Sequence, residues 1–266
     1  MKKIEYDTLS LIQKKLSKGR RTKIALSIAI SSDNTKAYVA CGYDGVVIFD
    51  IKDIPIQVGS FRTNGYAFSI VLSDDGKIAY VADGANGIVV KDVSNLNNIQ
   101  NIPTYGETGQ IIDLKISKDG TMAYAVNHEE GLIVYKIIEN IPYSIELDKI
   151  ASYSMPYCYH HNFTIQDNTI FACTENGIDI LELCDDKIIT KEQYKMKEKV
   201  NRVILSDNEK IAYAISSKKV TVLSLEKNSI KKVIKTNTFY RSVEDIVTDG
   251  TSACAKIGKD LIEILE

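Results

Sequence analysis

The sequence predicts an all-β chain built from one unit that is repeated six times. Each unit has a short run such as Ala37-Tyr38-Val39-Ala40, followed by a turn and an apolar run such as Val46 to Ile51. The copies start at residues 37, 79, 123, 170, 212 and 252, so their spacing is 40 to 47 residues. That period, with several short strands in each copy, is typical of β-propeller blades. We therefore expect a six-bladed β-propeller of four-stranded antiparallel blades.

Each unit contains four predicted strands. The first precedes a polar turn, as Ile70 to Leu72 precedes Ser73-Asp74-Asp75-Gly76; Asp starts such turns and Gly takes the positive φ. The second is the Ala-Tyr-Val-Ala run, whose aromatic residue we expect in the core. The third is apolar on both faces, as a sheet covered on both sides requires. The fourth is more polar and amphipathic, as in Lys187 to Tyr194 and Gln100 to Tyr105, which is typical of an outer edge strand.

We expect a single domain over residues 1–266, closed into a ring by its own N-terminal segment. The predicted blades are 24–63, 66–106, 110–154, 160–195, 200–236 and 243–266. The sixth unit stops after its third strand, Leu261 to Leu265. Residues 4–18 stand where a fourth strand would, so we expect them to pair with that strand and cover its edge. Helical periodicity is confined to Leu9 to Leu16, within this segment.

Composition excludes several classes of function. The chain has 33 basic and 35 acidic residues, so we expect no nucleic acid and no membrane partner. Its apolar stretches are far shorter than the roughly 20 residues of a membrane span. Glu5 and Asp7 interrupt what would be the apolar part of a signal peptide, so we expect a cytoplasmic protein. Five cysteines without a CxxC pair suit a reducing compartment.

The amino-acid sequence of the repeat resembles that of a known family. The segments YVACGYDGVVIFDI (38–51) and YVADGANGIVVKDV (80–93), with Tyr66-Ala67 after Gly65, resemble the LVIVD-repeat family of bacterial and archaeal proteins. The resemblance implies a propeller and implies little about function. The chain is more distantly similar to lactonase-type propellers with YVTN-like repeats, which usually have seven blades.

Candidate ligand-binding residues lie where the loops between blades meet the inner strands. Propellers generally bind ligands on the face that carries these connections and the loops between second and third strands. A polar residue enters every inner strand: Ser27, Ser69, Asp113, Asn162, Arg202 and Asp245. As a ring at the channel mouth, these residues would supply converging donors, acceptors and charges. The alternative is that they only solvate the mouth or satisfy one another.

Large side chains on the same connections extend this candidate site. They are Tyr66, Tyr159, His160, His161, Tyr240 and Arg241. Loop tyrosines combine apolar area with a polar tip, which suits recognition. Histidines near Asp113 are potential metal ligands, yet adjacent histidines in a strand point to opposite faces and no HxH or HExxH spacing occurs. We therefore expect no metal and no cofactor.

The sequence contains no catalytic motif of the GxSxG, GxxxxGK or GxGxxG type. We expect a monomeric, non-enzymatic binding or scaffold module that recognises a protein, a peptide or a small polar ligand on this face. The alternative is a lactonase-like hydrolase or isomerase, with or without a metal. It would use Asp113, His160 or His161, Arg202 and Asp245 as acid, base and anion-binding groups. A third hypothesis is a structural repeat inside a larger assembly.

Overall fold

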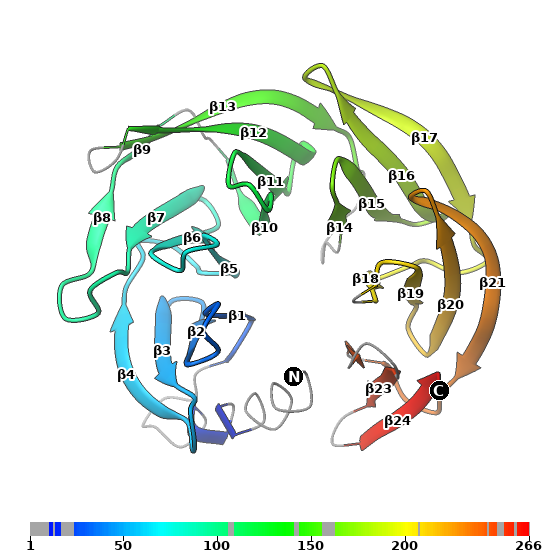
Figure 1. Ribbon diagram of the computed structural model, residues 1–266, viewed down its shortest axis with the longest axis horizontal. Helices are drawn as coiled ribbons and strands as arrows, with labels where there is room; N and C mark the ends of the chain where they lie inside the picture. Colours follow the sequence, from blue (N-terminus) through cyan, green and yellow to red (C-terminus); the bar gives the residue numbers. More distant parts are fainter. Residues whose placement is uncertain are drawn as a thin grey trace. The chain divides into compact units, whose positions relative to one another are not determined.

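A computed structural model of the chain describes residues 11–12, 14–16, 24–105, 109–140, 144–155, 163–206, 208–243, 245–248, 253–257 and 260–265. These residues contain 24 β-strands in six sheets (Figure 1). The sheets belong to two compact units, which we call the N-terminal unit (described residues 11–155) and the C-terminal unit (described residues 163–265). The predicted all-β fold is confirmed.

The N-terminal unit contains three sheets, in which every strand except β9 (Thr104–Tyr105) pairs antiparallel with its neighbour in sequence. The first sheet is β1 (Ser27–Ile30), β2 (Lys36–Ala40), β3 (Val46–Asp50) and β4 (Ile56–Phe61). The second is β5 (Ser69–Leu72), β6 (Ile78–Ala82), β7 (Ile88–Asp92) and β8 (Gln100–Ile102). The third is β10 (Ile111–Ile116), β11 (Met122–Asn127), β12 (Gly131–Asn140) and β13 (Ser144–Tyr153), with β9 added at its edge.

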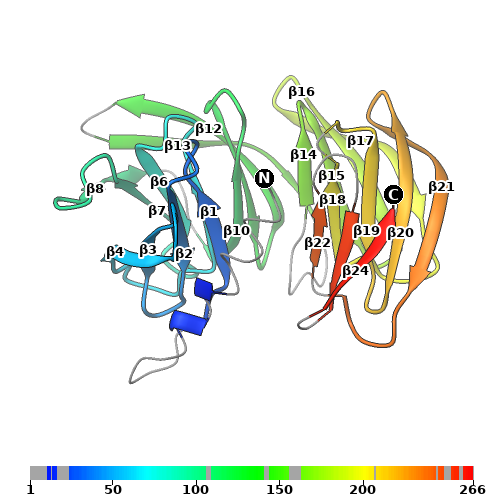
Figure 2. The same cartoon turned by 60° about the horizontal axis from the view of Figure 1, so that its bottom comes forward.

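The C-terminal unit repeats the same antiparallel arrangement. Its first sheet is β14 (Phe163–Gln166), β15 (Thr169–Thr174), β16 (Gly177–Cys184) and β17 (Lys187–Lys195). Its second is β18 (Arg202–Leu205), β19 (Ile211–Ile215), β20 (Lys219–Glu226) and β21 (Ser229–Thr238). Its third has three described strands, β22 (Asp245–Thr248), β23 (Ala253–Ile257) and β24 (Asp260–Leu265). Figure 2 shows the long hairpins β16–β17 and β20–β21.

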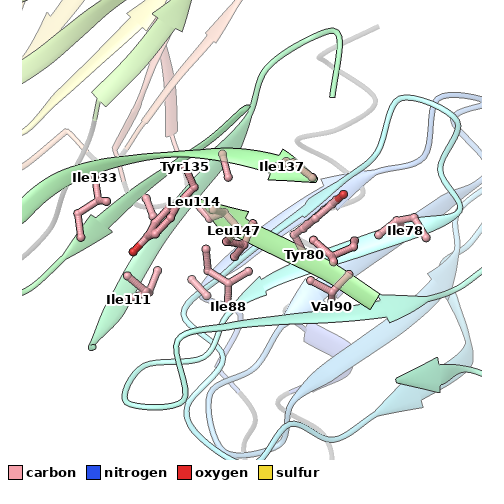
Figure 3. Packing of buried hydrophobic residues seen from close by; sticks show 14 of the residues in the cluster. Ile78, Tyr80, Ile88, Val90, Ile111, Leu114, Ile133, Tyr135, Ile137 and Leu147 are labelled. Atoms are coloured by element: carbon pink, nitrogen blue, oxygen red, sulfur yellow. The ribbon is translucent and has the colours of Figure 1, made fainter. Parts of the chain in front are cut away.

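The apolar cores lie between neighbouring sheets of each unit. The repeated aromatic residue of the second strand is buried in five of the sequence repeats, where its side chain is at most 2% exposed: Tyr38, Tyr80, Tyr124, Phe171 and Tyr213. Tyr80 and Val90 of the second sheet share one core with Leu114 and Leu147 of the third (Figure 3). Both faces of a middle strand are therefore covered, which explains why the third strands of the repeat are apolar throughout.

The connection between the second and third sheets differs from the prediction. Gln100 to Tyr105 was expected to be one outer strand, but it divides at Pro103 into β8 and the two-residue β9 (Thr104–Tyr105). β9 leaves the second sheet and pairs in parallel with β13, with Thr104 opposite Ile145. Proline lacks the N–H that would continue the ladder, so the strand ends there. The outer strand of the third sheet thereby gains a cover.

The predicted closing strand over residues 4–18 is wrong where the structure describes it. Residues 11–12 and 14–16 are helical, and the rest of the segment lies outside the described residues. Ile12 and Leu16, one helical turn apart, pack against Val39, Val47 and Phe49 of the first sheet. The segment therefore covers a face of that sheet. No helix among the described residues has the length and apolar character needed to cross a membrane.

Candidate functional site

In the turns between first and second strands, the polar side chains form hydrogen bonds within the turn itself. The hydroxyls of Ser31, Ser73 and Ser117 donate to Asp33, Asp75 and Asp119 at 2.6–2.7 Å. Each serine oxygen also accepts the backbone N–H five residues later, at 2.9–3.0 Å. Hydrogen bonds from Ser31 and Thr35 lower the pKa of Asp33 to about 2. Because these side chains bond one another and the turn backbone, we assign them a structural role at this end of the sheets.

At the opposite end, the loop between second and third strands is tied to the next connection. Gly42 and Ala67 exchange two backbone hydrogen bonds of 3.1 Å, and Gly84 and Ile111 exchange two of 3.0 Å. The loop itself is tight, because the N–H of Cys41 donates to the carbonyl of Gly45 at 2.8 Å. Side chains on this loop and on the connection are therefore held next to each other.

Three aromatic side chains, Tyr43, Tyr66 and Phe68, form a cluster at this point, which we call the aromatic cluster. The ring centroids of Tyr43 and Tyr66 are 4.8 Å apart with the rings perpendicular, and those of Tyr66 and Phe68 are 4.6 Å apart. Tyr43 is 81% exposed. A Cβ at Gly42 would meet the ring of Tyr66 at 2.7 Å, so the ring rests directly on the glycine backbone. The cluster presents an aromatic surface on a rigid support.

The next repeat has the same backbone arrangement without the aromatic side chains. Since Gly84 and Ile111 correspond to Gly42 and Ala67, the positions of Tyr43, Tyr66 and Phe68 correspond to those of Ala85, Gln110 and Ile112. The loop hydrogen bonds are also the same, with the N–H of Asp83 donating to Gly87 at 2.8 Å. The fold therefore does not require aromatic residues at these three positions.

Asp83 fastens the connection that carries Tyr66. It is fully buried, and its Oδ2 accepts the N–H of Gly65 at 2.8 Å and the side-chain amide of Asn86 at 3.3 Å. Burial raises the pKa of Asp83, against the opposing effect of these hydrogen bonds. In the next repeat, the equivalent residue is Asn127, which is 3% exposed and accepts the N–H groups of Glu129 and Glu130.

The structure brings two of the predicted channel-mouth residues together. Ser27 and Ser69 begin β1 and β5, and their Oγ atoms are 3.4 Å apart. The N–H of Ile70 also donates to Ser27 Oγ at 3.4 Å. Ser69 is 6% exposed, so this pair joins two sheets. This contact matches the alternative that such residues satisfy one another.

Asp113, Arg202 and Asp245 lie at or near the starts of their inner strands. Asp113 is the third residue of β10, at a bulge, and its carboxylate accepts the N–H of Leu114 at 2.9 Å. Arg202 and Asp245 begin β18 and β22, as expected. The guanidinium carbon of Arg241 lies 5.4 Å from the ring centroid of Tyr240, which is 63% exposed. The remaining candidates lie outside the described residues: Asn162, Tyr159, His160 and His161.

Metal binding has no geometric support in the described part of the chain. No three His, Cys, Asp or Glu side chains gather there in a group that would hold a metal ion. Cys41, Cys173 and Cys184 form no disulfide bond. The metal-dependent hydrolase alternative therefore rests on the histidine pair outside the described residues.

Sequence reasoning named Tyr66 but did not single out Tyr43 and Phe68. The signal that would have found them is the comparison of equivalent positions between repeats, where Ala85 and Ile112 are not aromatic.

Comparisons with known proteins show the fold and no family. No family model and no curated protein sequence matches the chain, so the resemblance to the LVIVD-repeat family stays a prediction. The β-propeller domain of Myceliophteria thermophila Cps50 (Swd1) is similar in structure, with a TM-score of 0.69 and 10% identity, over 91% of this chain and 82% of that one.

A second solved structure gives the same result. Hydrazine synthase of Kuenenia stuttgartiensis is similar with a TM-score of 0.65 and 15% identity, over 90% of this chain and 83% of that one. At such low identity, the likeness concerns the fold alone. Together with the repeated four-stranded meanders, it shows that this chain has a β-propeller fold.

Proposed function

We propose that the chain is a non-enzymatic binding module that recognises a protein or peptide through the aromatic cluster of Tyr43, Tyr66 and Phe68. One observation carries this proposal: the repeat keeps its backbone geometry with Ala85, Gln110 and Ile112 at the equivalent positions. Three aromatic residues that the fold does not need, gathered at a single connection, call for another explanation. Recognition of a partner supplies one.

The presentation of Tyr43 suits an anchor for a macromolecule. The ring is 81% exposed and is held by the edge contact with Tyr66 and by the tight Cys41–Gly45 loop. Tyrosine has only two side-chain torsions, so it loses little entropy on binding, and it is enriched among the residues that dominate interface energies. The carboxylate of Asp44, half-buried beside it, offers an acceptor at the rim.

Photocrosslinking tests the placement of the site. A photoreactive phenylalanine analogue at position 43 should form a covalent adduct with the partner in the native cell. The same analogue at position 74, an exposed residue of a turn at the other end of the sheets, should form none. Adducts from position 74 alone, or from neither position, would contradict the proposal.

Repeat-matched substitutions test the role of each ring. Tyr43→Ala, Tyr66→Gln and Phe68→Ile install the residues of the next repeat, so we expect normal folding. Each of the first two should weaken binding of the crosslinked partner about 10-fold or more. Tyr240→Ala removes an exposed tyrosine in the C-terminal unit and is the matched control. Loss of binding with Tyr240→Ala alone would move the site to that unit.

We also infer that the six sheets are six blades of one propeller, with the last blade completed by residues before Leu11. The likeness to solved propellers over nine-tenths of the chain supports this inference, as do the three described strands of the last sheet. Deletion of residues 1–10 should lower the melting temperature, although it keeps the helical residues 11–12 and 14–16. Unchanged stability would contradict closure by this segment.

A further inference from the structure

The outer strand β4 is an exposed edge with apolar side chains. It lies at the edge of its sheet, in the order β1-β2-β3-β4. Ile54 and Ile56 are 67% and 60% exposed, and Val58 is 45% exposed. Ile56 and Val58 belong to β4, and Ile54 lies two residues before it, so exposed apolar side chains follow this edge as far as a β-bulge at Val58, where the register with β3 shifts.

Three other outer strands, β13, β17 and β21, are protected in ways that β4 is not. β17 carries Lys187, Lys191 and Lys195, and β21 carries Lys231, Lys232 and Lys235. The two residues of β9 cover the start of the β13 edge, opposite Ile145 and Glu146. Lysines and covering segments are the usual devices that keep edge strands from pairing with other chains. β4 reads IQVGSF and contains no charged residue.

We propose that β4 pairs with β4 of a second copy of this chain, in an antiparallel arrangement about a two-fold axis. A strand without charges meets its own copy without like-charge repulsion. The flanking residues fit this direction. Asp50, Lys52 and Asp53 precede the strand with a net charge of −1, and Arg62 follows it.

The direction of pairing follows from these flanks. Antiparallel pairing places the acidic start of one β4 beside Arg62 of the other, twice in each dimer. Parallel pairing would bring each flank against its own copy. The two-fold axis also brings the exposed Ile54, Ile56 and Val58 of the two copies to the same joined edge. There they cover part of each other, so the dimer removes apolar area from water as well as satisfying the strand edge.

A dimer held by one added strand pair is small, so we expect it to form at concentrations of about 10–100 μM. This departs from the monomer expected from the sequence. Sedimentation velocity of the full chain from about 1 to 300 μM should show the mass rise from 29.6 kDa towards twice that value. A constant mass of one chain over this range would overturn the proposal.

Two matched valines test the surface. Val58→Lys places a charge at the centre of the pairing strand and should weaken the dimer at least about 10-fold. Val233→Lys makes the same change on β21, at a residue of nearly equal exposure (47% against 45%), and should leave the dimer unchanged. Both melting temperatures should stay near that of the wild type. Equal effects of the two variants, or none from Val58→Lys, would rule out β4 as the interface.

A charge exchange tests the direction of pairing. Asp53→Arg and Arg62→Asp should each weaken the dimer, and the double variant should restore it. If the double variant is as weak as the single ones, the antiparallel arrangement is wrong. These experiments are independent of the aromatic cluster, because Tyr43→Ala should leave the mass distribution unchanged.

Discussion

The backbone N–H of Gly65 donates a hydrogen bond of 2.8 Å to Oδ2 of the buried Asp83. A Cβ at Gly65 would come within 2.3 Å of the carbonyl oxygen of Asp83, so the connection can lie this close only with glycine. Within the described part of the chain, Oδ1 of Asp83 and Oγ1 of Thr63 are buried without a well-formed hydrogen bond. The carboxylate therefore holds Tyr66 in place at a cost in solvation.

Asp83→Asn should be more stable than the wild type at neutral pH. Burial raises the pKa of Asp83, so the folded wild type is destabilised above its folded pKa and recovers as the pH falls. The difference between the two proteins should shrink as the pH falls towards 3.8 and vanish below it. Urea unfolding of both proteins from pH 3 to 8 measures this. A pH-independent difference would contradict the assignment.

Ser31→Ala should raise the pKa of Asp33 from about 2 towards its ordinary 3.8. The Ser31 hydroxyl is the largest cause of the lowered value, and the bonds from Thr35 remain in the variant. In the wild type, the stabilisation linked to Asp33 is complete above pH 3.8 and is lost as the pH falls through about 2. NMR titration of the carboxyl carbon measures the change, with Ser60→Ala as the control.

Gly177→Ala should destabilise the protein much more than Gly76→Ala. Both glycines have positive φ, but a Cβ at Gly177 would meet the carbonyl oxygen of Tyr194 at 2.0 Å, whereas one at Gly76 would meet nothing within 4 Å. We expect about 1 kcal/mol for Gly76→Ala from backbone strain alone, and more than about 3 kcal/mol for Gly177→Ala. Denaturant unfolding of the two variants gives both values, and equal losses would show that the contact is relieved elsewhere.

Ile12→Ala should lower the free energy of unfolding by about 2–5 kcal/mol, the usual range for a fully buried aliphatic residue. Ile12 is 0% exposed in the core of the first sheet, while its neighbour Leu11 is 41% exposed. Leu11→Ala should therefore change stability by less than about 1 kcal/mol. Similar melting temperatures for the two variants would mean that the helical segment does not stabilise the first sheet.

Much of the fold could be predicted because two independent signals mark the strands of each repeat. One is the pattern of apolar residues, and the other is the polar turn that follows the first strand. The buried positions of Tyr38, Tyr80 and Tyr213 confirm the first kind of signal. The turns beginning at Ser31, Ser73 and Ser117 explain the second, because their side chains bond the local backbone and need no distant partner.

Features that depend on contacts between neighbouring sheets could not be predicted in this way. The Lys-rich segment near Ile12 resembled an outer strand, although the spacing of Ile12 and Leu16 already indicated a helical face. Of the aromatic cluster, only Tyr66 was predicted from the sequence. Its contacts with Tyr43 and Phe68 form across the connection between two sheets, and the sequence does not show that these three rings meet. The role of Asp83 was missed because its burial depends on how close the glycine connection lies.

The parallel pairing of β9 with β13 has a mechanical consequence. The chain leaves the second sheet at Ile102 and is at once bonded to the edge of the third, with the N–H of Ile145 donating to the carbonyl of Pro103 at 2.9 Å. Separating β13 from its sheet therefore requires either breaking the β9–β13 hydrogen bonds or moving the chain that follows β8 with it. These two sheets should therefore open together as one cooperative unit, with amides of both exchanging hydrogen at a common rate.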